Sequence, residues 1–447
     1  MARLAKSDGA QPRVQPTLSA DQALELAIHV HRAGDIEDAE MLYGRILDAA
    51  PDMPEALHFL GIQKHQTGRA HEAVDLLRRA VSLMPDRAEM RSNLGNVLSE
   101  QERFAEAAES YGAAIALKPD FVEAHSNLGA ALRRLARTDE AEASYRRAIE
   151  LDPNLREAHE NLGRLLLHSG RNVESLACFT RALELEPHNA DTRRLLVSTH
   201  AAAKNYAKAL SILDEWLGEE PRNPTALHLR AAISGENVPA RAGDAYVETM
   251  FDRFAPGFDV NLAELDYQAP RLVGGALAAA AGSKRQLAIL DAGCGTGLCA
   301  PHLAPFAAHL AGVDLSPRML DRARARGGYE ALHHGELTRF LLDHPGSWDA
   351  VVSADTLCYF GALDEVARAT ADALRPGGIL VFTVEREDGP DPFRINTTGR
   401  YSHRRDYVDA VLVAAGLQAS KIDQETLRVE RGTLVAGLVV TACKPSG

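Results

Sequence analysis

The chain has 447 residues, 46% hydrophobic and 25% charged, which is long enough for two globular units with separate cores. Its formal net charge of -13 disfavours a nucleic-acid backbone or an anionic membrane surface as the main partner, because both bind basic faces. Five cysteines form neither a C-x-x-C pair nor a metal-ligand spacing, which predicts a reducing compartment and no metal site. No apolar run is long enough for a signal peptide or a membrane span, so we expect a soluble, cytoplasmic protein.

The first half of the chain is an internal repeat with a period of 34 residues. The repeated prolines are Pro51, Pro85, Pro119, Pro153, Pro187 and Pro221. In phase with them stand Leu60-Gly61, Leu94-Gly95, Leu128-Gly129 and Leu162-Gly163, and also Ala39, Ala73, Ala107, Ala141 and Ala209, with Ser175 at the alanine position of the fifth unit. Each unit therefore predicts two helices, with small residues where they approach and a proline that ends the second.

These motifs resemble the tetratricopeptide repeat, in six units from about Ala20 to Asn223 and a capping helix at 224–233. The resemblance implies an all-α superhelix over 20–233 with a concave surface lined by the first helix of each unit. We expect residues 1–19, ahead of the repeats, to be disordered. Asn93, Asn127 and Asn161 share one position in three consecutive units, and two interpretations are open: solvated surface residues, or a ladder that binds the backbone of a protein or peptide partner.

A change of pattern follows residue 233. Gly and Pro gather in a predicted linker at 234–244, and from Leu287 short β-rich runs alternate with helical stretches. Two closing strands, near 427–430 and 434–443, have no helix between them. Residues 245–447 therefore predict a doubly wound α/β sheet with an antiparallel edge, which binds ligands at the carboxyl ends of its central strands.

A glycine-rich turn follows the first of these strands, in the run from Ile289 to Gly297. Glycines admit a ligand close to the backbone and permit a positive φ. A dinucleotide-binding turn would have a third glycine where Leu298 stands, which disfavours an NAD-dependent oxidoreductase. Asp314, which ends the second strand, can accept hydrogen bonds from a ribose but does not by itself distinguish NAD from other nucleotide cofactors.

The G-x-G-x-G turn with Asp291 ahead of it resembles the first motif of class I S-adenosylmethionine-dependent methyltransferases. The run from Gly312 to Leu320 and the Leu374–Gly378 string extend that resemblance. Segments around Phe251-Asp252, Phe258-Asp259 and 265–270, and later 400–407, are similar to methyltransferases that carry tetratricopeptide repeats. The resemblance implies a Rossmann-like, seven-stranded domain and S-adenosyl-L-methionine as cofactor.

The same resemblance implies a set of cofactor-binding residues. It consists of Asp291, Gly293, Gly295, Gly297, Asp314, Leu315, Met319, Glu336 and Leu337. In this set the glycines admit the methionine portion, Asp291 orients its amino end directly or through water, Asp314 holds the ribose, and Glu336-Leu337 contacts the adenine. Asp291 and Glu336 have an alternative interpretation as helix-capping or turn carboxylates.

Three residues are candidates on the catalytic side: Asp355 and Tyr359 after the fourth strand, and His403. Each could take a proton from the nucleophile or position it; the alternative interpretation is an ordinary loop hydrogen bond for Asp355 and Tyr359 and a solvated loop histidine for His403. The pair His333-His334 does not predict a metal, because adjacent strand residues point to opposite faces.

Four functions follow from this reading of the chain. The leading one is a methyltransferase whose repeats recruit a protein or peptide. The second is a small-molecule methyltransferase whose repeats serve localisation or assembly. A non-catalytic scaffold and an NAD-dependent enzyme are the others. The intact set of Asp291, Gly293, Gly295 and Asp314 counts against the scaffold.

Overall fold

The computed structural model describes residues 18–430 and 432–446. The predicted disorder of residues 1–17 therefore falls outside the described residues. Ser19, the last residue of that predicted segment, caps the first helix: its Oγ accepts a hydrogen bond from the Gln22 N–H at 3.2 Å, and the Gln22 side chain accepts one from the Ser19 N–H at 3.0 Å. This capping box satisfies two backbone donors, so helical order begins at the end of that segment.

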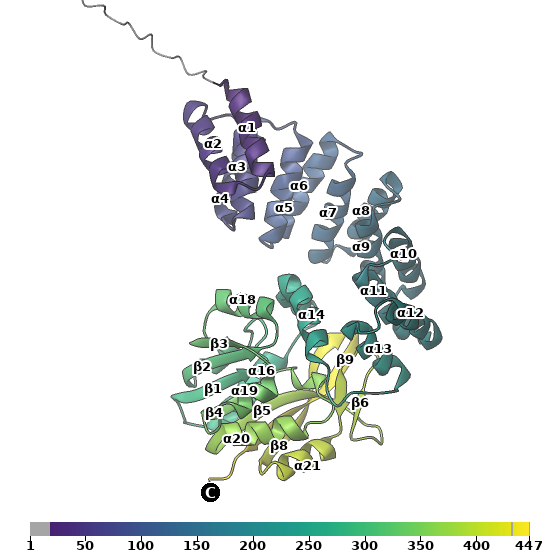
Figure 1. The fold of residues 1–447 in the computed structure, drawn as a ribbon, viewed down its shortest axis with the longest axis vertical. Helices are drawn as coiled ribbons and strands as arrows, with labels where there is room; N and C mark the ends of the chain where they lie inside the picture. The colour runs from purple at the N-terminus through teal and green to yellow at the C-terminus, as the bar shows by residue number, and fades with distance from the viewer. Residues whose placement is uncertain (1–17, 431, 447) are drawn as a thin grey trace, which may run out of the picture. The chain divides into compact units, whose positions relative to one another are not determined.

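The chain divides into two compact units, each described by itself. The first extends to Leu167 and includes Ala177–Pro187, and the second contains His168–Leu176 and the chain from His188 onward. The first unit consists of antiparallel helix pairs, as the repeat predicts (Figure 1). They are α1 (Ala20–Arg32), α2 (Ile36–Ala49), α3 (Pro54–Gln66), α4 (Ala70–Leu83), α5 (Ala88–Glu100), α6 (Phe104–Leu117), α7 (Val122–Arg134), α8 (Thr138–Leu151), α9 (Arg156–His168) and α10 (Asn172–Leu185).

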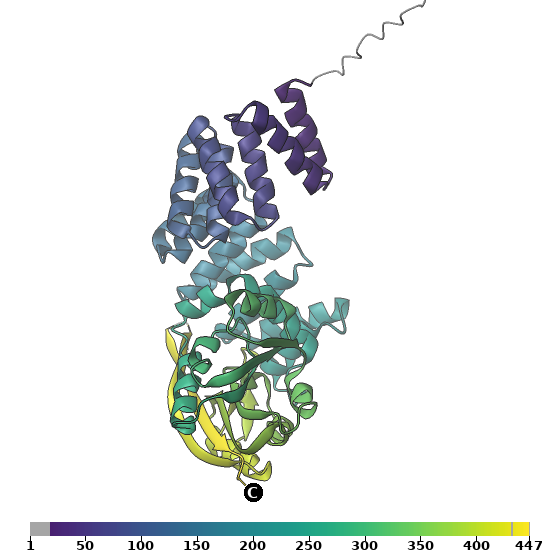
Figure 2. The ribbon, with the colours of Figure 1, turned by 90° about the vertical axis from the view of Figure 1, so that its left-hand side faces the viewer.

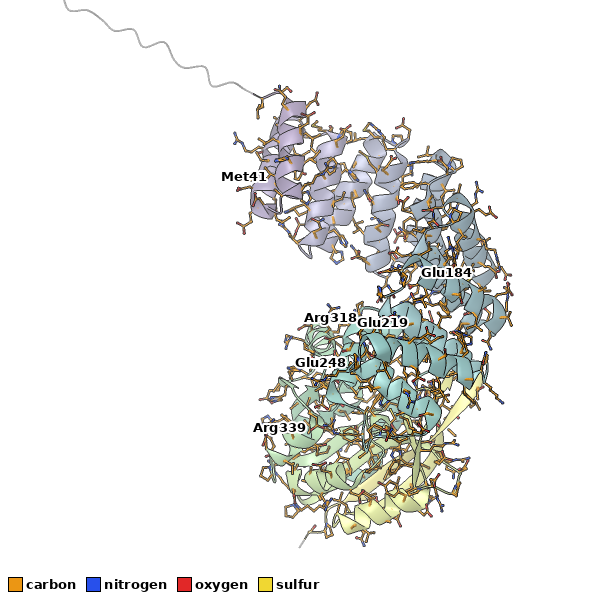
Figure 3. All side chains as sticks on the ribbon, turned by 45° about the vertical axis from the view of Figure 1, so that its right-hand side comes forward. Met41, Glu184, Glu219, Glu248, Arg318 and Arg339 are labelled. Atoms are coloured by element: carbon orange, nitrogen blue, oxygen red, sulfur yellow. The ribbon has the colours of Figure 1, made fainter. Side chains whose placement is uncertain are left out.

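The repeated glycines lie where paired helices approach most closely. A Cβ added to Gly129 of α7 would lie 2.7 Å from Cδ1 of Tyr145 on α8, and one added to Gly95 of α5 would lie 2.6 Å from Cε1 of Tyr111 on α6. Both tyrosines are almost completely buried. The repeat therefore pairs a large buried side chain on the second helix with a position on the first that has no room for a Cβ. Met41, by contrast, is exposed on α2 (Figure 3).

Besides the start of α10, the second unit contains the sixth repeat and the capping helix: α11 (Ala190–Ala202), α12 (Tyr206–Glu219) and α13 (Pro224–Ser234). Its remaining helices are α14 (Asp244–Phe254), α15 (Phe258–Glu264), α16 (Ala269–Ala281), α17 (Ala300–Leu303), α18 (Pro317–Arg326), α19 (Leu337–Leu342), α20 (Asp364–Ala373) and α21 (Arg405–Ala414). Its strands are β1 (Leu287–Ala292), β2 (Ala307–Asp314), β3 (Ala331–His334), β4 (Trp348–Ser353), β5 (Leu374–Arg386), β6 (Phe393–Ile395), β7 (Tyr401–His403), β8 (Gln418–Glu430) and β9 (Thr433–Cys443).

The strands form one doubly wound sheet. Strands β3, β2, β1, β4 and β5 pair in parallel in that order, and β9 and then β8 close the edge in antiparallel fashion. Figure 2 shows the long C-terminal strands along one side of the domain. These strands are the seven expected. Within the described ranges the sheet has nine strands, because β7 pairs with the end of β5 and β6 pairs with β7.

Helices cover both faces of the sheet, so its central strands are buried. Apolar residues of α16 and α17 pack on the face that includes Leu287 and Ile289 of β1. Residues of α19, α20 and α21 pack on the face that includes Leu290 and Ala292. Because strand side chains alternate between faces, Asp291 shares the α16 face with Leu287 and Ile289. Arg318 and Arg339, on α18 and α19, are exposed (Figure 3).

The segment 234–244 differs from the sparsely packed linker that its composition predicts. Its backbone pairs with the loop after β4: Ala242 N–H donates to the Tyr359 carbonyl at 2.8 Å, and Gly361 N–H donates to the Ala240 carbonyl at 2.9 Å. The division between compact units lies near residue 188 and not within this segment. Backbone hydrogen bonds with a distant loop cannot be read from local Gly and Pro content.

Candidate functional site

The turn after β1 is made by three glycines in the left-handed region. Gly293, Gly295 and Gly297 have φ of +79°, +53° and +86°. A Cβ at Gly293 would overlap the side chain of Thr356, whereas one at Gly295 would meet no heavy atom within 4 Å. Left-handed φ favours glycine at all three positions, and the open space before Gly295 leaves room for a ligand against the backbone.

Asp314, at the end of β2, holds this turn. One carboxylate oxygen accepts a hydrogen bond from the Gly295 N–H at 2.8 Å, and the other accepts one from the Ser316 N–H at 2.9 Å. Burial raises the pKa of Asp314 above its usual range, and these two N–H donors oppose that rise. The two motifs that the sequence singled out are therefore in direct contact.

Glu336 and Leu337 lie at the start of α19. The Glu336 carboxylate caps the helix by accepting the backbone N–H of Thr338 at 3.0 Å and that of Arg339 at 2.9 Å. Glu336 and Leu337 also line the cavity in front of Gly295. Glu336 therefore both caps α19 and lines the cavity.

This cavity has a volume of about 310 Å³, within the usual range for small-ligand sites. Gly293, Gly295, Asp314 and Leu315 contribute one wall. Three phenylalanines of α14 and α15 line another; we call them the aromatic cap: Phe251, Phe254 and Phe258.

Two aspartates beside the aromatic cap connect it to the glycine turn and to the loop after β2. Asp252 accepts a hydrogen bond from Ser316 Oγ at 2.6 Å, and Asp259 accepts one from Thr296 Oγ1 of the glycine turn. These are the aspartates of the two Phe-Asp pairs in the sequence. The loops after β1 and β2 therefore hold the cap at the cavity.

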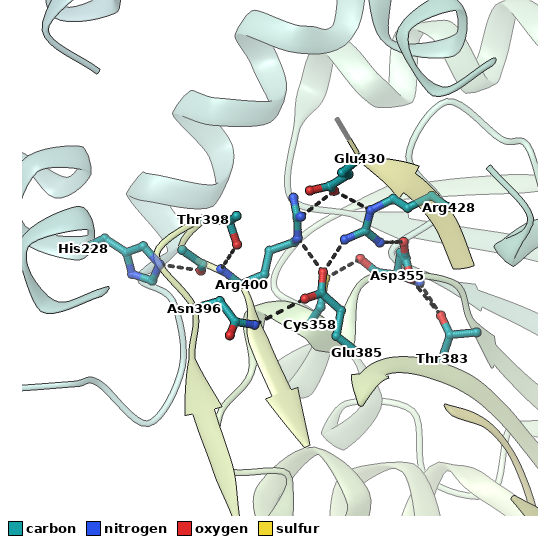
Figure 4. Close-up of polar contacts among 11 residues, drawn as sticks. His228, Asp355, Cys358, Thr383, Glu385, Asn396, Thr398, Arg400, Arg428 and Glu430 are labelled. Atoms are coloured by element: carbon teal, nitrogen blue, oxygen red, sulfur yellow. Dashed lines mark hydrogen bonds and ion pairs between the residues drawn. The ribbon is translucent and has the colours of Figure 1, made fainter. Parts of the chain in front are cut away.

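A buried group of charged residues lies at the same cavity, and we call it the charge network: Asp355, Glu385, Arg400, Arg428 and Glu430 (Figure 4). Arg428, on β8, is at its centre and donates to Asp355 and Glu430 at 2.6 Å each, and also to Glu385. All members except Glu385 line the cavity. Buried charges of this kind are stable only when paired, which this arrangement achieves.

Asp355 and Tyr359, two of the three catalytic candidates, line the same cavity. Asp355 has an unusual backbone φ of +52° for a residue other than glycine, and burial raises its pKa while Arg428 lowers it. Burial raises the pKa of Tyr359 well above its usual range, so its phenol stays protonated. Its ring meets Phe251 of the aromatic cap edge-on at 5.4 Å.

His403, the third catalytic candidate, does not line the cavity, which disfavours a catalytic role. Its side chain is fully buried, its Nε2 donates to the Gly361 carbonyl at 3.1 Å, and its ring stacks parallel to that of Tyr407. Burial lowers the pKa of His403 to about 4. The fold uses this histidine for packing, because β7 pairs with β5 inside the domain.

Three cofactor candidates also lie outside the cavity lining, for reasons of side-chain direction. Met319 is fully buried on the inner face of α18, and a Cβ on Gly297 would face Tyr329. Asp291 is fully buried beneath the turn, where Tyr329 Oη donates to its Oδ2 at 2.6 Å. Its Oδ1 has no hydrogen-bond partner among the described residues. Burial raises the pKa of Asp291 to about 7.

The three asparagines of the repeats are half-buried on the first helices of their units. The Asn93 amide lies 2.9 Å from His58 Nε2, and the Asn127 amide donates to Asn96 Oδ1 at 3.0 Å. The amide nitrogens of these two therefore contact the preceding repeat. A simple solvated role does not account for these contacts.

The sequence motifs include Asp355 but not Glu385, Arg428 and Glu430 of the charge network, and they do not include the buried His228 of α13. One local signal existed, because Arg428 and Glu430 are two residues apart on a strand and so share a face. Arg400 lies in the segment 400–407, whose one sequence signal is its resemblance to methyltransferases that carry tetratricopeptide repeats. Within the described residues, no group of three or more His, Cys, Asp or Glu side chains could hold a metal ion. No helix in that part of the chain is long and apolar enough to cross a membrane.

Comparisons with known proteins agree with both parts of this architecture. Family models for the tetratricopeptide repeat match residues 52–120, 92–156, 131–181 and 166–233, and a model described as a methyltransferase domain matches residues 290–382. The chain therefore carries tetratricopeptide repeats followed by a methyltransferase domain.

Particular relatives match parts of the chain. Methyltransferase-like protein 27 of Homo sapiens is 40% identical over 136 residues, which are 30% of this chain and 55% of that protein. The ubiquinone biosynthesis O-methyltransferase of Aromatoleum aromaticum is 32% identical over 99 residues, 21% of this chain and 42% of that protein. The crystal structure of MamA is 26% identical with a TM-score of 0.35, covering 37% of this chain and 96% of its own. The chain spans about half the length of these curated relatives.

Proposed function

We propose that this chain is an S-adenosylmethionine-dependent methyltransferase whose cofactor binds in the cavity lined by the glycine turn and Asp314. The observation that carries the proposal is the contact between these two motifs beside a cavity. The left-handed Gly295 faces open space, and the carboxylate that holds its N–H lines the same cavity. The methyltransferase family match over residues 290–382 includes both motifs.

The residues present fit this cofactor. Each Asp314 oxygen accepts one backbone N–H and can accept a further hydrogen bond, as two ribose hydroxyls require. Gly293 and Gly295 admit the methionine portion, and Glu336 and Leu337 meet the adenine. Asp291 is fully buried and outside the cavity lining, so we assign it to supporting the turn through its bond with Tyr329 and not to contact with the cofactor.

The cofactor would supply a methyl group on a positively charged sulfur. The acceptor atom bonds to the methyl carbon in line with the carbon–sulfur bond, and the sulfur leaves. The protein's task is then alignment and the exclusion of water. The aromatic cap supports exclusion, since its rings line the cavity and Asp252 and Asp259 hold it on the cofactor loops. Asp355 lines the cavity, and its carboxylate can take a proton from the substrate atom that receives the methyl group. The protonated Tyr359 can orient that substrate.

The repeats are proposed to recruit a protein or peptide partner, with Asn93, Asn127 and Asn161 among its contacts. This partner is the first candidate for the methyl acceptor. A small-molecule acceptor is the second, and the aromatic wall of the cavity favours it. The O-methyltransferase name of one relative is consistent with an oxygen nucleophile in that case.

Titration calorimetry with S-adenosylhomocysteine and, separately, with NAD tests the cofactor. We expect binding of the first and none of the second; NAD binding alone would overturn the proposal. Transfer of labelled methyl from S-adenosylmethionine into lysate, resolved into protein and small-molecule fractions, then decides between the two acceptors. Label in neither fraction, despite cofactor binding, would favour a non-catalytic scaffold.

A further inference from the structure

The β6–β7 hairpin brings the capping helix of the repeats against the methyltransferase domain. Ala232 of α13 packs with Ile395 and Tyr401 of the hairpin in one apolar cluster. The Tyr401 hydroxyl donates to the Pro239 carbonyl at 2.8 Å. The turn of this hairpin is therefore held on one side by α13 and the segment after it.

His228 of α13 makes the most specific of these contacts. It is 4% exposed, and its Nε2 lies 2.8 Å from the carbonyl oxygen of Gly399 in the hairpin turn. A carbonyl only accepts, so Nε2 carries the proton and donates it. The ring stacks on Tyr246 of α14 with centroids 4.0 Å apart.

Gly399 fits this place because it has no side chain. Its φ is +85°, and an added Cβ would lie 2.8 Å from the Tyr246 hydroxyl and 3.2 Å from Cδ2 of His228. Both the conformation and the close contact require glycine. The two aromatic rings therefore determine where the backbone of residue 399 lies.

The next residue, Arg400, lines the cavity and belongs to the charge network (Figure 4). Its Nε donates to Glu385 at 2.6 Å and its Nη2 donates to Glu430, while Arg428 bonds the same two carboxylates. Its third nitrogen, Nη1, has no partner within the described ranges, and Arg400 lines the cavity. Arg400 thus offers N–H donors to the cavity.

We propose that α13, the capping helix of the repeats, supports the methyl-acceptor pocket from outside, with His228 as a positioning residue that holds Gly399 and thereby fixes Arg400 at the cavity. Arg400 then binds a hydrogen-bond-accepting group of the methyl acceptor. This inference rests on the proposed function, and it adds a direct structural path from the repeats to the acceptor side of the site. The acceptor side should respond to changes in α13, and the cofactor side should not.

The test uses the full chain and compares His228→Leu, which removes the donor, with His228→Gln, whose amide can still donate to the Gly399 carbonyl. Leu227→Gln, at an exposed position of the same helix, is the control. Phenylglyoxal modifies accessible arginines, so mass spectrometry of the Arg400 peptide reports how firmly Arg400 is held. The exposed Arg394 serves as the internal reference.

We expect His228→Leu to raise the modification rate of Arg400 roughly two- to tenfold, the factor that corresponds to one neutral hydrogen bond. His228→Gln should restore most of the protection, and Leu227→Gln should not change it. Gly399→Ala, which acts on the turn directly, should expose Arg400 in the same way. Methyl transfer to the fraction labelled by the wild type should fall in His228→Leu and recover in His228→Gln, with affinity for S-adenosylhomocysteine within about twofold.

Unchanged Arg400 protection in a folded His228→Leu protein would overturn the positioning role. Equal loss in the Leu and Gln variants would also overturn it, because it would mean that the histidine only fills space. Changed Arg400 protection with unchanged methyl transfer would remove Arg400 from the acceptor pocket. Failure of the wild type to bind S-adenosylhomocysteine would instead refute the proposed function, and the arginine modification would still decide whether His228 holds Arg400.

Discussion

The backbone N–H of Gly295 donates a hydrogen bond to the Asp314 carboxylate across 2.8 Å, which joins the turn after β1 to the end of β2. Asp314→Ala removes this bond and the proposed contacts with the ribose. We expect it to weaken S-adenosylhomocysteine binding by roughly 1.5 to 3 kcal/mol, measured by calorimetry. Asp321→Ala, an exposed carboxylate on α18, is the matched control. Wild-type affinity in a folded Asp314→Ala protein would exclude Asp314 from the site. Gly295→Val should weaken S-adenosylhomocysteine binding more than Asp314→Ala does. The valine Cβ would occupy the space before the turn, and the backbone φ at position 295 is left-handed.

Asp291 predicts a pH effect, since burial raises the pKa of its carboxyl to about 7 in the fold, well above the 3.8 of a free aspartate. Between these two values the folded state binds more protons than the unfolded state. The contribution of Asp291 to stability is therefore present below about pH 4 and is lost as the pH rises through 7. Urea unfolding at pH 5 and pH 7 should show a larger loss of stability in the wild type than in Asp291→Asn. An identical pH dependence in both proteins would contradict the raised pKa.

Arg428 is expected to be essential for the stability of the methyltransferase domain. Arg428→Met would leave Asp355, Glu385 and Glu430 without their shared cation, and removing one partner of a buried ion pair costs roughly 3 to 5 kcal/mol. Denaturant unfolding monitored by circular dichroism measures this loss. Arg394→Met, at an exposed arginine of β6, should change stability far less. A loss below about 1 kcal/mol in Arg428→Met would mean that the carboxylates find other partners or stay protonated.

The paired repeat helices predict opposite effects for two glycine substitutions. Gly129→Ala places a Cβ 2.7 Å from the buried ring of Tyr145, and such overpacking costs roughly 1 to 3 kcal/mol. Gly112→Ala, on α6, meets no heavy atom within 4 Å and should stabilise the helix by about 0.5 to 1 kcal/mol. Thermal unfolding of the two variants should therefore shift in opposite directions. Shifts of the same sign would mean that Tyr145 can move aside.

The asparagine ladder remains a prediction about the repeats. Replacing Asn93, Asn127 and Asn161 by alanine should lower the affinity for a protein or peptide partner by about one to three orders of magnitude, since each neutral hydrogen bond contributes roughly 0.5 to 1.5 kcal/mol. Cofactor affinity should not change. Capture of partners from lysate by wild-type and triple-variant protein is the measurement.

Met41→Ala, at an exposed position on α2, is the control for that capture experiment. The structure adds one requirement, because the Asn93 and Asn127 amides also contact the preceding repeat. Thermal unfolding must show that the triple variant keeps its fold. Equal capture by a folded triple variant would show that the asparagines serve only contacts between repeats.

Much of the architecture could be predicted from the sequence because it rests on local or periodic signals. The 34-residue period is visible in Pro51 and Pro85, and each repeat contacts mainly its neighbours. The glycine turn and Asp314 could also be predicted from the sequence. A left-handed φ favours glycine, and a ribose contact at a strand end favours a carboxylate.

Only the tertiary structure decided which of the candidate residues reach the cavity. Asp291 and His403 have the residue types of functional side chains, but strand alternation and the pairing of β7 with β5 turn them into the interior. In contrast, Arg400 and Arg428 became neighbours through Glu385, and His228 reached Gly399 from a repeat helix 171 residues earlier in the chain. Such contacts depend on which surfaces pack together after the sheet and the repeats have formed, and no local pattern of residues specifies that packing.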